Sequence, residues 1–150
     1  MDITHGGFVH QALGFEVDLP LAFDDAMSAT RDALKAAGFG VLTEIDMQAA
    51  FKEKLGEQFR RYTILGACNP TLAFAAINED PAIGLLLPCN VTVESVADDR
   101  SHVRIADPQM MLSAAPRMSS ALRKVAEDAR TRMEGVVADL ARMAPKEGAQ

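Results

Sequence analysis

The stretch GFEVDLP at residues 14–20 decides the fold of this 150-residue chain, because apolar and acidic residues alternate along it without interruption. Successive side chains of a β-strand point to opposite faces of the sheet. One face therefore holds the apolar residues and the other the acidic residues: Phe15, Val17 and Leu19 against Glu16 and Asp18. Pro20 ends the stretch, since it lacks the N–H that a strand ladder needs. The pattern predicts a strand in a sheet that is covered on one side and wet on the other.

The rest of the chain divides into helices and strands at recognisable start and stop signals. Gly38 and Gly56 stand where helices are expected to end, Asp46 and Asn69 are suited to cap helix N-termini, and Pro70 suits a first helical position. The expected helices cover residues 22–37, 47–55, 70–78 and 116–143, with a short helical turn after residues 107–108; the further strands cover residues 40–45, 59–65, 89–96 and 101–106.

This order of elements, β-α-β-α-β-α-β-β-α, predicts the α+β class. We expect a two-layer sandwich, with a mixed, mostly antiparallel sheet of about five strands and the helices on one face. The sequence contains no linker long enough to separate two domains. Residues 1–150 are therefore expected to form a single domain, with flexible ends over residues 1–11 and 144–150.

The expected helix over residues 116–143 is long for a domain of this size. At 1.5 Å per residue it would extend roughly 42 Å, more than the chain's own sheet comfortably covers. Two interpretations are open. Either the apolar stripe of the helix continues into a subunit interface, which predicts a homodimer, or the helix breaks or frays near Gly135.

The composition restricts the classes of partner. The chain has 49% hydrophobic residues, 21 acidic against 15 basic residues and a formal charge of −6. Nucleic acids and anionic membranes both attract basic surfaces, so we predict that neither is a partner. The sequence has no signal-peptide pattern, no segment apolar enough to span a bilayer, and only two cysteines. A cytoplasmic location with reduced thiols is expected.

Two similar loops carry a pattern that a hydrophobic core does not require. They are GACNP at residues 66–70 and LPCNV at residues 87–91, and each places Cys-Asn at the edge of a regular element. The common phosphate-binding, dinucleotide-binding, zinc-protease, serine-hydrolase and CxxC motifs are absent from the sequence. The loops around Cys68 and Cys89 are therefore the candidate site.

Cys68 has two possible roles. It precedes an expected helix N-terminus, where unpaired N–H groups and the helix dipole would stabilise a thiolate that attacks, binds a metal or forms a transient disulfide. Alternatively it is a small buried hydrophobe, an interpretation that is stronger for Cys89 at the start of a strand. A parallel crossover between the two would hold the thiols far apart, whereas a chain that returns through residues 84–88 would bring them together.

Other reactive side chains form no recognisable pattern. His102 belongs on the wet face of its strand, and two further histidines stand in the expected flexible start. A site made of Cys68, Cys89 and one histidine has suitable ligand types but no known spacing, so no metal is predicted. Residues 60–62, Arg-Arg-Tyr, offer positive charge and a hydroxyl to a small anion, or are simply solvated.

Several segments resemble a known family: GVLTEID at residues 40–46, KEKLG at 52–56, ILGACNP at 64–70 and GLLLPCNV at 84–91. The chain is similar, over about residues 15–140, to the bacterial and archaeal family called domain of unknown function 302. The resemblance implies a small stand-alone α+β domain, often dimeric, with no assigned activity. The family pattern falls on Cys68, Asn69, Pro70, Pro88, Cys89 and Asn90.

The leading hypothesis is a homodimeric accessory module that binds a small molecule near the start of the helix at Pro70. The candidate ligand-binding residues are Cys68, Asn69, Pro70, Cys89 and Asn90. One alternative is a thiol-dependent redox enzyme or sensor that uses both cysteines, and another is a structural homodimer or interaction protein. The sequence names no cofactor, catalytic residue or reaction.

Overall fold

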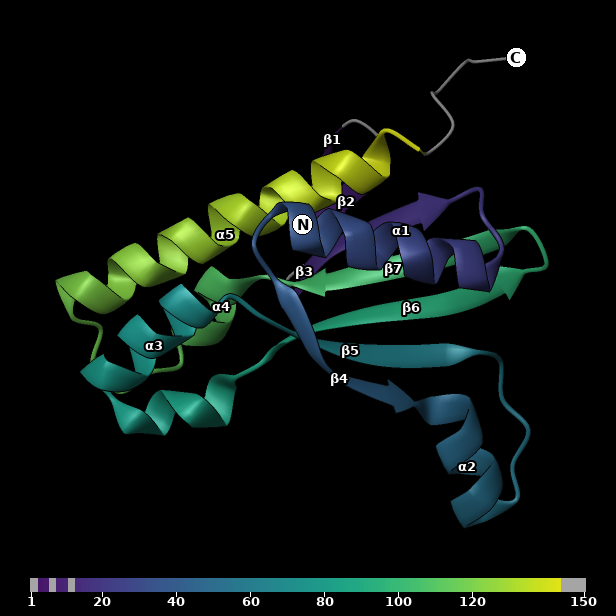
Figure 1. Ribbon diagram of the computed structural model, residues 1–150, viewed down its shortest axis with the longest axis horizontal. Helices are drawn as coiled ribbons and strands as arrows, with labels where there is room; N and C mark the ends of the chain where they lie inside the picture. Colours follow the sequence, from purple (N-terminus) through teal and green to yellow (C-terminus); the bar gives the residue numbers. More distant parts are fainter. Residues whose placement is uncertain (1–2, 6–7, 11–12, 144–150) are drawn as a thin grey trace.

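The computed structural model describes residues 3–5, 8–10 and 13–143 of the chain. Helices α1 and α5 lie across one face of a single sheet (Figure 1). The strands are β1 (Ile3–His5), β2 (Phe8–His10), β3 (Gly14–Leu19), β4 (Gly40–Asp46), β5 (Tyr62–Cys68), β6 (Cys89–Ala97) and β7 (Arg100–Ala106). The helices are α1 (Phe23–Ala36), α2 (Met47–Leu55), α3 (Pro70–Glu79), the 3-10 helix η1 (Pro81–Leu86), α4 (Pro108–Leu112) and α5 (Ser120–Ala141).

The strands lie in the order β1-β2-β3-β7-β6-β5-β4, and each neighbouring pair is antiparallel. The five expected strands are all present as β3 to β7, so the predicted α+β sandwich is confirmed. The sheet is antiparallel rather than mixed, because β5 and β6 are neighbours that run in opposite directions. The helical segment between them therefore returns the chain instead of crossing it over.

Two short strands extend the sheet beyond the expected five. Residues 3–5 and 8–10 form a hairpin, and β2 pairs with β3 so that Phe8 stands opposite Val17. The ring of Phe8 also packs edge to face on Phe15, with the ring centroids 6.2 Å apart. This contact gives an apolar reason for the pairing of β2 with β3, which the sequence analysis did not predict. Residues 144–150, the other expected flexible end, lie outside the described residues.

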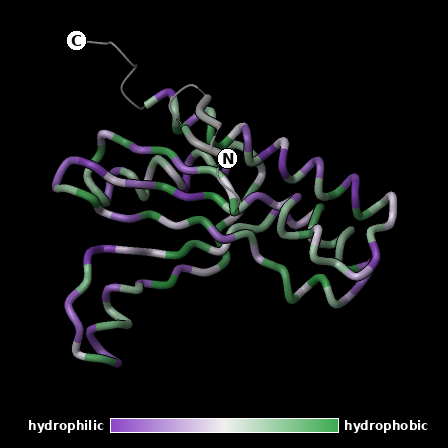
Figure 2. The backbone as a smooth tube through the Cα atoms, turned by 180° about the vertical axis from the view of Figure 1, so that it is seen from behind, coloured by the Kyte–Doolittle hydropathy of each residue, from purple (hydrophilic) through white to green (hydrophobic). Residues whose placement is uncertain are grey.

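The hydrophobic core lies between the sheet and helices α1 and α5. Strand residues alternate between apolar and polar along the sheet (Figure 2), and the apolar positions of β3 face the core as predicted. The buried strand residues that meet the helices are Phe15, Val17, Leu19, Leu65, Ala67, Val91, Val93, Val103 and Ile105. The helices contribute Ala26, Ala33 and Leu34 from α1, and Met133, Val136, Val137 and Leu140 from α5.

Helix α5 is shorter than expected and is covered by its own chain. It begins at Ser120 because the Ser119 hydroxyl accepts a hydrogen bond from the Leu122 N–H at 3.0 Å, a typical N-cap. It continues without a break through Gly135, and buried residues occur along its whole length, from Leu122 to Ala141. The expected break near Gly135 is therefore wrong, and the apolar stripe of the helix packs against its own chain. Among the described residues, no helix combines the length and the apolarity that crossing a bilayer requires.

The expected caps organise the remaining helices. Asp46 and Asn69 accept hydrogen bonds from the N–H groups of Ala49 and Leu72, at 3.0 and 3.1 Å. Strand β5 begins at Tyr62 instead of residue 59, because the Phe59 ring turns to pack against Phe51 of α2, with the ring centroids 5.2 Å apart.

Strand β4 and helix α2 together form a projecting arm over residues 40–55, which we call the β4–α2 arm (Figures 1 and 2). Strand β4 is the last strand of the sheet and is exposed along nearly all of its length. Helix α2 has no buried residue, and Leu42 and Leu55 are 68% and 67% exposed. Strand β4 is attached by antiparallel pairing with β5, from Gly40 opposite Cys68 to Asp46 opposite Thr63. Helix α2 is held by the Phe51–Phe59 contact and by a hydrogen bond from Gln48 to the Phe59 carbonyl.

The contact between β3 and β7 depends on the absence of a side chain at Gly14. A Cβ atom at this position would lie 2.0 Å from the carbonyl oxygen of Ile105. We expect Gly14→Ala to lower the free energy of unfolding by about 2–3 kcal/mol, because the strands must separate to admit the methyl group. Chemical denaturation measures this change.

Gly135→Ala is the matched control, since no atom outside its own helix lies within 4 Å of a Cβ there. It should raise the free energy of unfolding by about 1 kcal/mol, because alanine favours the helix. A Gly14→Ala protein as stable as the wild type would contradict the close strand contact.

Candidate functional site

The two Cys-Asn loops meet at one end of the sheet. In the register of β5 and β6, Ala67 stands opposite Cys89 and Gly66 stands opposite Asn90. The chain leaves β5 after Cys68, passes through α3 and η1, and returns to the neighbouring strand position. Of the two topologies considered from the sequence, the chain therefore adopts the one that brings the cysteines together. Both are free thiols.

A small apolar cavity of about 40 Å³ lies between the loops. Its lining consists of Phe39, Ala67, Cys68, Asn69, Leu72, Ala73, Ala76, Leu87, Pro88 and Cys89. One water molecule occupies about 30 Å³ in the liquid, so this cavity has room for one water and not for an organic ligand. Four of the five candidate ligand-binding residues thus border or adjoin a space that is too small for the predicted role.

Asn69 and Pro70 form the N-terminus of α3. The Asn69 side-chain oxygen accepts the Leu72 N–H, and Pro70 fills the first helical position. The amide nitrogen of Asn69 also lies close to Gly38, where a Cβ would approach it to 3.0 Å. Asn69 therefore connects the end of α1 with the start of α3.

Burial keeps both thiols protonated. Burial raises the pKa of Cys68, and burial together with the nearby Cys68 raises the pKa of Cys89 to about 11. Of the two roles considered for Cys68, the raised pKa favours the small hydrophobe over the stabilised thiolate, because the partly buried thiolate would lose solvation.

The sheet face opposite α1 and α5, which we call the open face, carries a network of ion pairs. Arg104 donates hydrogen bonds to Glu16 at 2.8 Å and to Glu94 at 2.6 Å, so it bridges three strands. Arg60 also donates to Glu94. Burial alone would raise the pKa of Glu94, but the hydrogen bonds and positive charges of Arg104 and Arg60 outweigh it and hold that pKa below its usual value.

A second part of this network lies further along β3 and β7. His102 Nδ1 lies 2.9 Å from Asp18 Oδ1, and Arg100 donates to Asp18 Oδ2 at 2.7 Å. Burial raises the pKa of Asp18, whereas His102 and Arg100 lower it, and the net shift is downward. His102 therefore lies on the wet strand face, as the sequence predicts, and its Nδ1 is within hydrogen-bond distance of Asp18.

A larger cavity of about 600 Å³, which we call the open-face cavity, lies over β3, β7 and β6. Its lining consists of Leu13, Gly14, Phe15, Glu16, Tyr62, Asn90, Thr92, Arg104, Ile105, Ala106 and Met111. Ligand sites usually have volumes of about 300–1,000 Å³ and a mainly apolar lining with a few polar groups. Among the described residues, the side chains of Asn90 and Tyr62 find no hydrogen-bond partner, so both remain available to a ligand.

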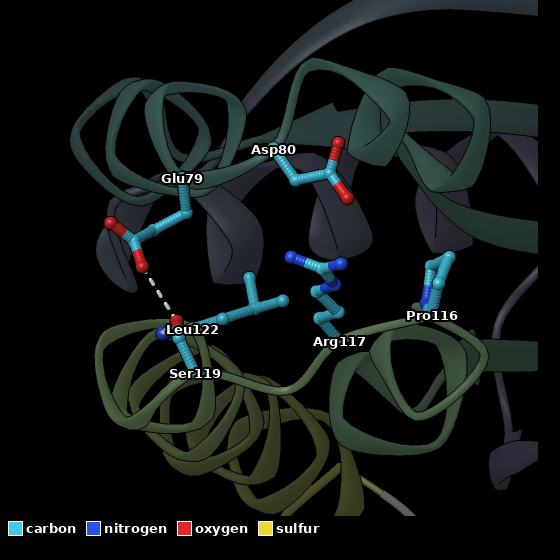
Figure 3. A pocket seen from close by; sticks show the side chains of 6 residues that line it. All are labelled: Glu79, Asp80, Pro116, Arg117, Ser119 and Leu122. Carbon is cyan, nitrogen blue, oxygen red and sulfur yellow. Dashed lines mark hydrogen bonds between the residues drawn. The ribbon is translucent and has the colours of Figure 1, made fainter.

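A third hollow, of about 390 Å³, separates the end of α3 from the start of α5 (Figure 3). Ser119 donates a hydrogen bond to Glu79 at 2.6 Å across it. Arg117 extends toward Asp80 in this hollow and forms no ion pair within the described part of the chain. Exposed charges at helix ends account for the hollow, and it contains none of the residues that the sequence singles out.

The remaining candidates are distributed without forming a centre. Arg60 and Arg61 stack over the rings of Phe59 and Phe23, with the guanidinium carbons 4.3 and 4.1 Å from the ring centroids. Both arginines also pair with carboxylates, so the suggested anion site at residues 60–62 has no spare charge. Within the described ranges, no group of three or more His, Cys, Asp and Glu side chains is arranged to hold a metal ion.

The sequence analysis did not identify the residues that join Asn90 and Tyr62 around the open-face cavity. Only Glu16 and Arg104 could have been placed on this face from the sequence, because each is a charged residue on the wet side of an alternating strand. Thr92 shows no such signal, although its buried hydroxyl lacks a hydrogen-bond partner in the described part of the protein. Their convergence depends on the pairing of β3 with β7 and of β7 with β6.

The raised pKa of Cys89 makes the stability of the protein depend on pH. The protonated thiol is favoured in the folded state, so its stabilising effect is complete below pH 9.0, the ordinary pKa, and is lost as the pH rises toward about 11. We expect the free energy of unfolding of the wild type to fall over this range by roughly 2 kcal/mol more than that of Cys89→Ala.

Denaturation at a series of pH values from 8 to about 11.5 measures this difference, and it separates Cys89 from other groups that titrate there. Parallel pH profiles for the two proteins would show that Cys89 titrates normally.

The comparisons with known proteins agree with this fold. Residues 15–140 match the model of the family described as Domain of unknown function DUF302. The chain is also similar to an uncharacterized conserved protein, DUF302, from Bacillus stearothermophilus, known from a crystal structure, with 27% sequence identity and a TM-score of 0.73. The similarity covers 87% of this chain and 98% of that one. No curated protein is significantly similar to the chain. The chain thus belongs to the DUF302 family of domains of unknown function.

Proposed function

We propose that this domain is an accessory module that binds a small molecule in the open-face cavity. The observation that carries the proposal is a cavity of about 600 Å³ in which the Asn90 amide and the Tyr62 hydroxyl have no partner among the described residues. Asn90 is exposed and Tyr62 is half-buried, so a ligand in the cavity would replace the water on these groups with hydrogen bonds of its own. Two free thiols are consistent with a reducing compartment, so the location we propose is the cytoplasm.

Of the five candidate residues, Asn90 is the one that we assign to direct ligand contact. Cys68, Asn69, Pro70 and Cys89 would act indirectly, by fixing the start of β6. The supporting observation is the register in which Asn90 follows directly after the Ala67–Cys89 pair. Because a shift of one residue in this register would turn Asn90 to the other sheet face, the loops around both cysteines determine whether it reaches the cavity.

A thiol-dependent redox function is the second candidate, favoured by the proximity of Cys68 to Cys89. The pKa values oppose it, since a thiolate is the reactive form of cysteine and burial raises both pKa values. Ligand binding is therefore the function that the site supports better.

The ligand-binding proposal predicts where small molecules bind. In a fragment screen followed by ¹⁵N–¹H NMR, we expect hits to shift the amides of Asn90, Thr92, Arg104 and Ala106. Asn90→Ala should weaken these hits about three- to tenfold, the usual effect of losing one hydrogen bond. Asn78→Ala, an exposed asparagine on α3 outside the cavity, is the matched control and should leave binding unchanged. Hits that cluster elsewhere would contradict the proposal.

We also propose that the module is a homodimer that associates through the β4–α2 arm. An edge strand has unpaired backbone groups, and two copies of β4 related by a two-fold axis are able to pair antiparallel. The arm further exposes Leu42, Ile45 and Leu55. Lys52 and Lys54 form no ion pair within the described residues, and neither do Glu53 and Glu57, so the arm offers charges of both signs to a second copy.

Sedimentation velocity tests this association. We expect the wild type to sediment as a dimer at micromolar concentration and Leu42→Lys to sediment as a monomer, since a charge would be buried at the two-fold interface. Leu85→Lys is the control, because Leu85 is also highly exposed, at 88%, but lies on η1 away from the arm. A monomeric wild type, or an equal effect of both substitutions, would refute this interface.

A further inference from the structure

We infer that the open-face cavity selects an uncharged, mainly apolar molecule that carries one hydrogen-bonding oxygen. This inference rests on the proposed function of the cavity and adds the chemical class of its ligand. Three properties of the lining lead to it: the pairing of its charges, the apolar residues at one end, and the unpartnered Asn90 amide beside them.

The charges that line the cavity are already paired. Glu16 and Arg104 are its two charged residues, and Arg104 Nε donates to Glu16 Oε1 at 2.8 Å. A carboxylate ligand would have to compete with Glu16 and Glu94 for Arg104, and an ammonium ligand would approach the Arg104 guanidinium. A charged ligand of either sign would lose its hydration in the cavity, and the opposite charge that it meets there is already paired within the protein. A neutral molecule is therefore favoured.

The apolar residues gather where β3 begins and β7 ends. Leu13 is 75% exposed beside Gly14, and Ala106 and Met111 lie at the same end of the cavity. Because Gly14 and Ala106 have little or no side chain, a ligand is able to approach the backbone closely at this end. Contact with Leu13 and Met111 would remove apolar surface from water, which favours a hydrocarbon body over a polar one.

The unpartnered Asn90 amide adds one polar contact beside this apolar end. Asn90 stands level with Ala106, because the neighbouring residues Val91 and Ile105 are paired, whereas Tyr62 pairs with Glu94 further along the sheet. The amide offers both a donor and an acceptor. An alcohol or a carbonyl oxygen is able to accept from it, and an alcohol also donates to it. A pure hydrocarbon would displace water from Asn90 without replacing its hydrogen bonds, so one oxygen atom on an apolar body is the chemistry that fits.

Tyr62 itself provides a readout, because the chain contains one tyrosine and no tryptophan. Its emission therefore reports on the cavity without labelling. Cyclohexanol, cyclohexanecarboxylate and cyclohexylammonium share one ring, differ in charge at neutral pH and do not absorb where tyrosine does. Titration of the full-length wild type with each compound compares the three charges on an equal apolar body.

We expect cyclohexanol to change Tyr62 emission and to bind at least about fivefold more tightly than either ion, because desolvating a charge is costly. Asn90→Ala should weaken cyclohexanol binding about three- to tenfold, whereas Asn78→Ala should not. Following the Asn90 and Thr92 amides by NMR in the same titrations checks that the emission change comes from the cavity.

The possible failures are distinguishable. If an ion binds in the cavity as tightly as cyclohexanol or more tightly, the ligand class is wrong while the proposed binding function stands. If cyclohexanol binds with equal affinity to the wild type and Asn90→Ala, the assignment of its oxygen is wrong. If neither the Tyr62 emission nor the Asn90 amide responds to any probe, both the class and the proposed function are overturned.

Discussion

The rest of this structure depends on the burial of one sheet face under α1 and α5. Strand residues such as Val91, Val93 and Val103 are fully buried beneath these helices. Burying each of these side chains stabilises the folded state by about 1.5–3 kcal/mol relative to leaving it exposed. Helix α5 packs over β3 and β2, and α1 lies over β6, β7 and β4. Because the helices occupy one face, the polar groups of the other face must satisfy one another, and the Arg104 network does so across three strands. The candidate ligand site lies within this network.

Much of the fold could be predicted from the sequence because its signals are local. The alternation at residues 14–19 and the caps at Asp46 and Asn69 act over a few residues, and each predicted element appears in the structure. The predictions failed where contacts between residues distant in the sequence determine the structure. Phe59 leaves its expected strand to pack on Phe51, and residues 3–5 and 8–10 form two strands, not predicted from the sequence, that extend the sheet beside β3. Neither contact has a short-range signature.

The candidate site could be predicted only in part. The repeated Cys-Asn pattern correctly indicated two loops that meet, and it included Asn90, which lines the larger cavity. It left the role of Cys68 open between a thiolate and a small hydrophobe, because burial cannot be judged from a residue's position before a helix. Tyr62, Arg104 and Met111 come from β5, β7 and α4, and only the register of the sheet brings them together. Family membership adds the fold but not the chemistry, because the DUF302 relatives are themselves uncharacterised.

The path of the chain between β5 and β6 has an evolutionary consequence. The chain leaves the sheet next to Ala67 and re-enters it at Cys89, directly across from the point of departure. Everything from Asn69 to Pro88, including α3 and η1, is thus a detour whose two ends nearly coincide. Closing a somewhat longer or shorter loop changes its entropy only slowly, but Ala76 and Ile83 of the detour belong to the buried cluster that covers Leu122 and Ala126 of α5. The apolar side of the detour is therefore constrained by α5, and its exposed side, beside the candidate site, is where one scaffold is able to acquire different specificities.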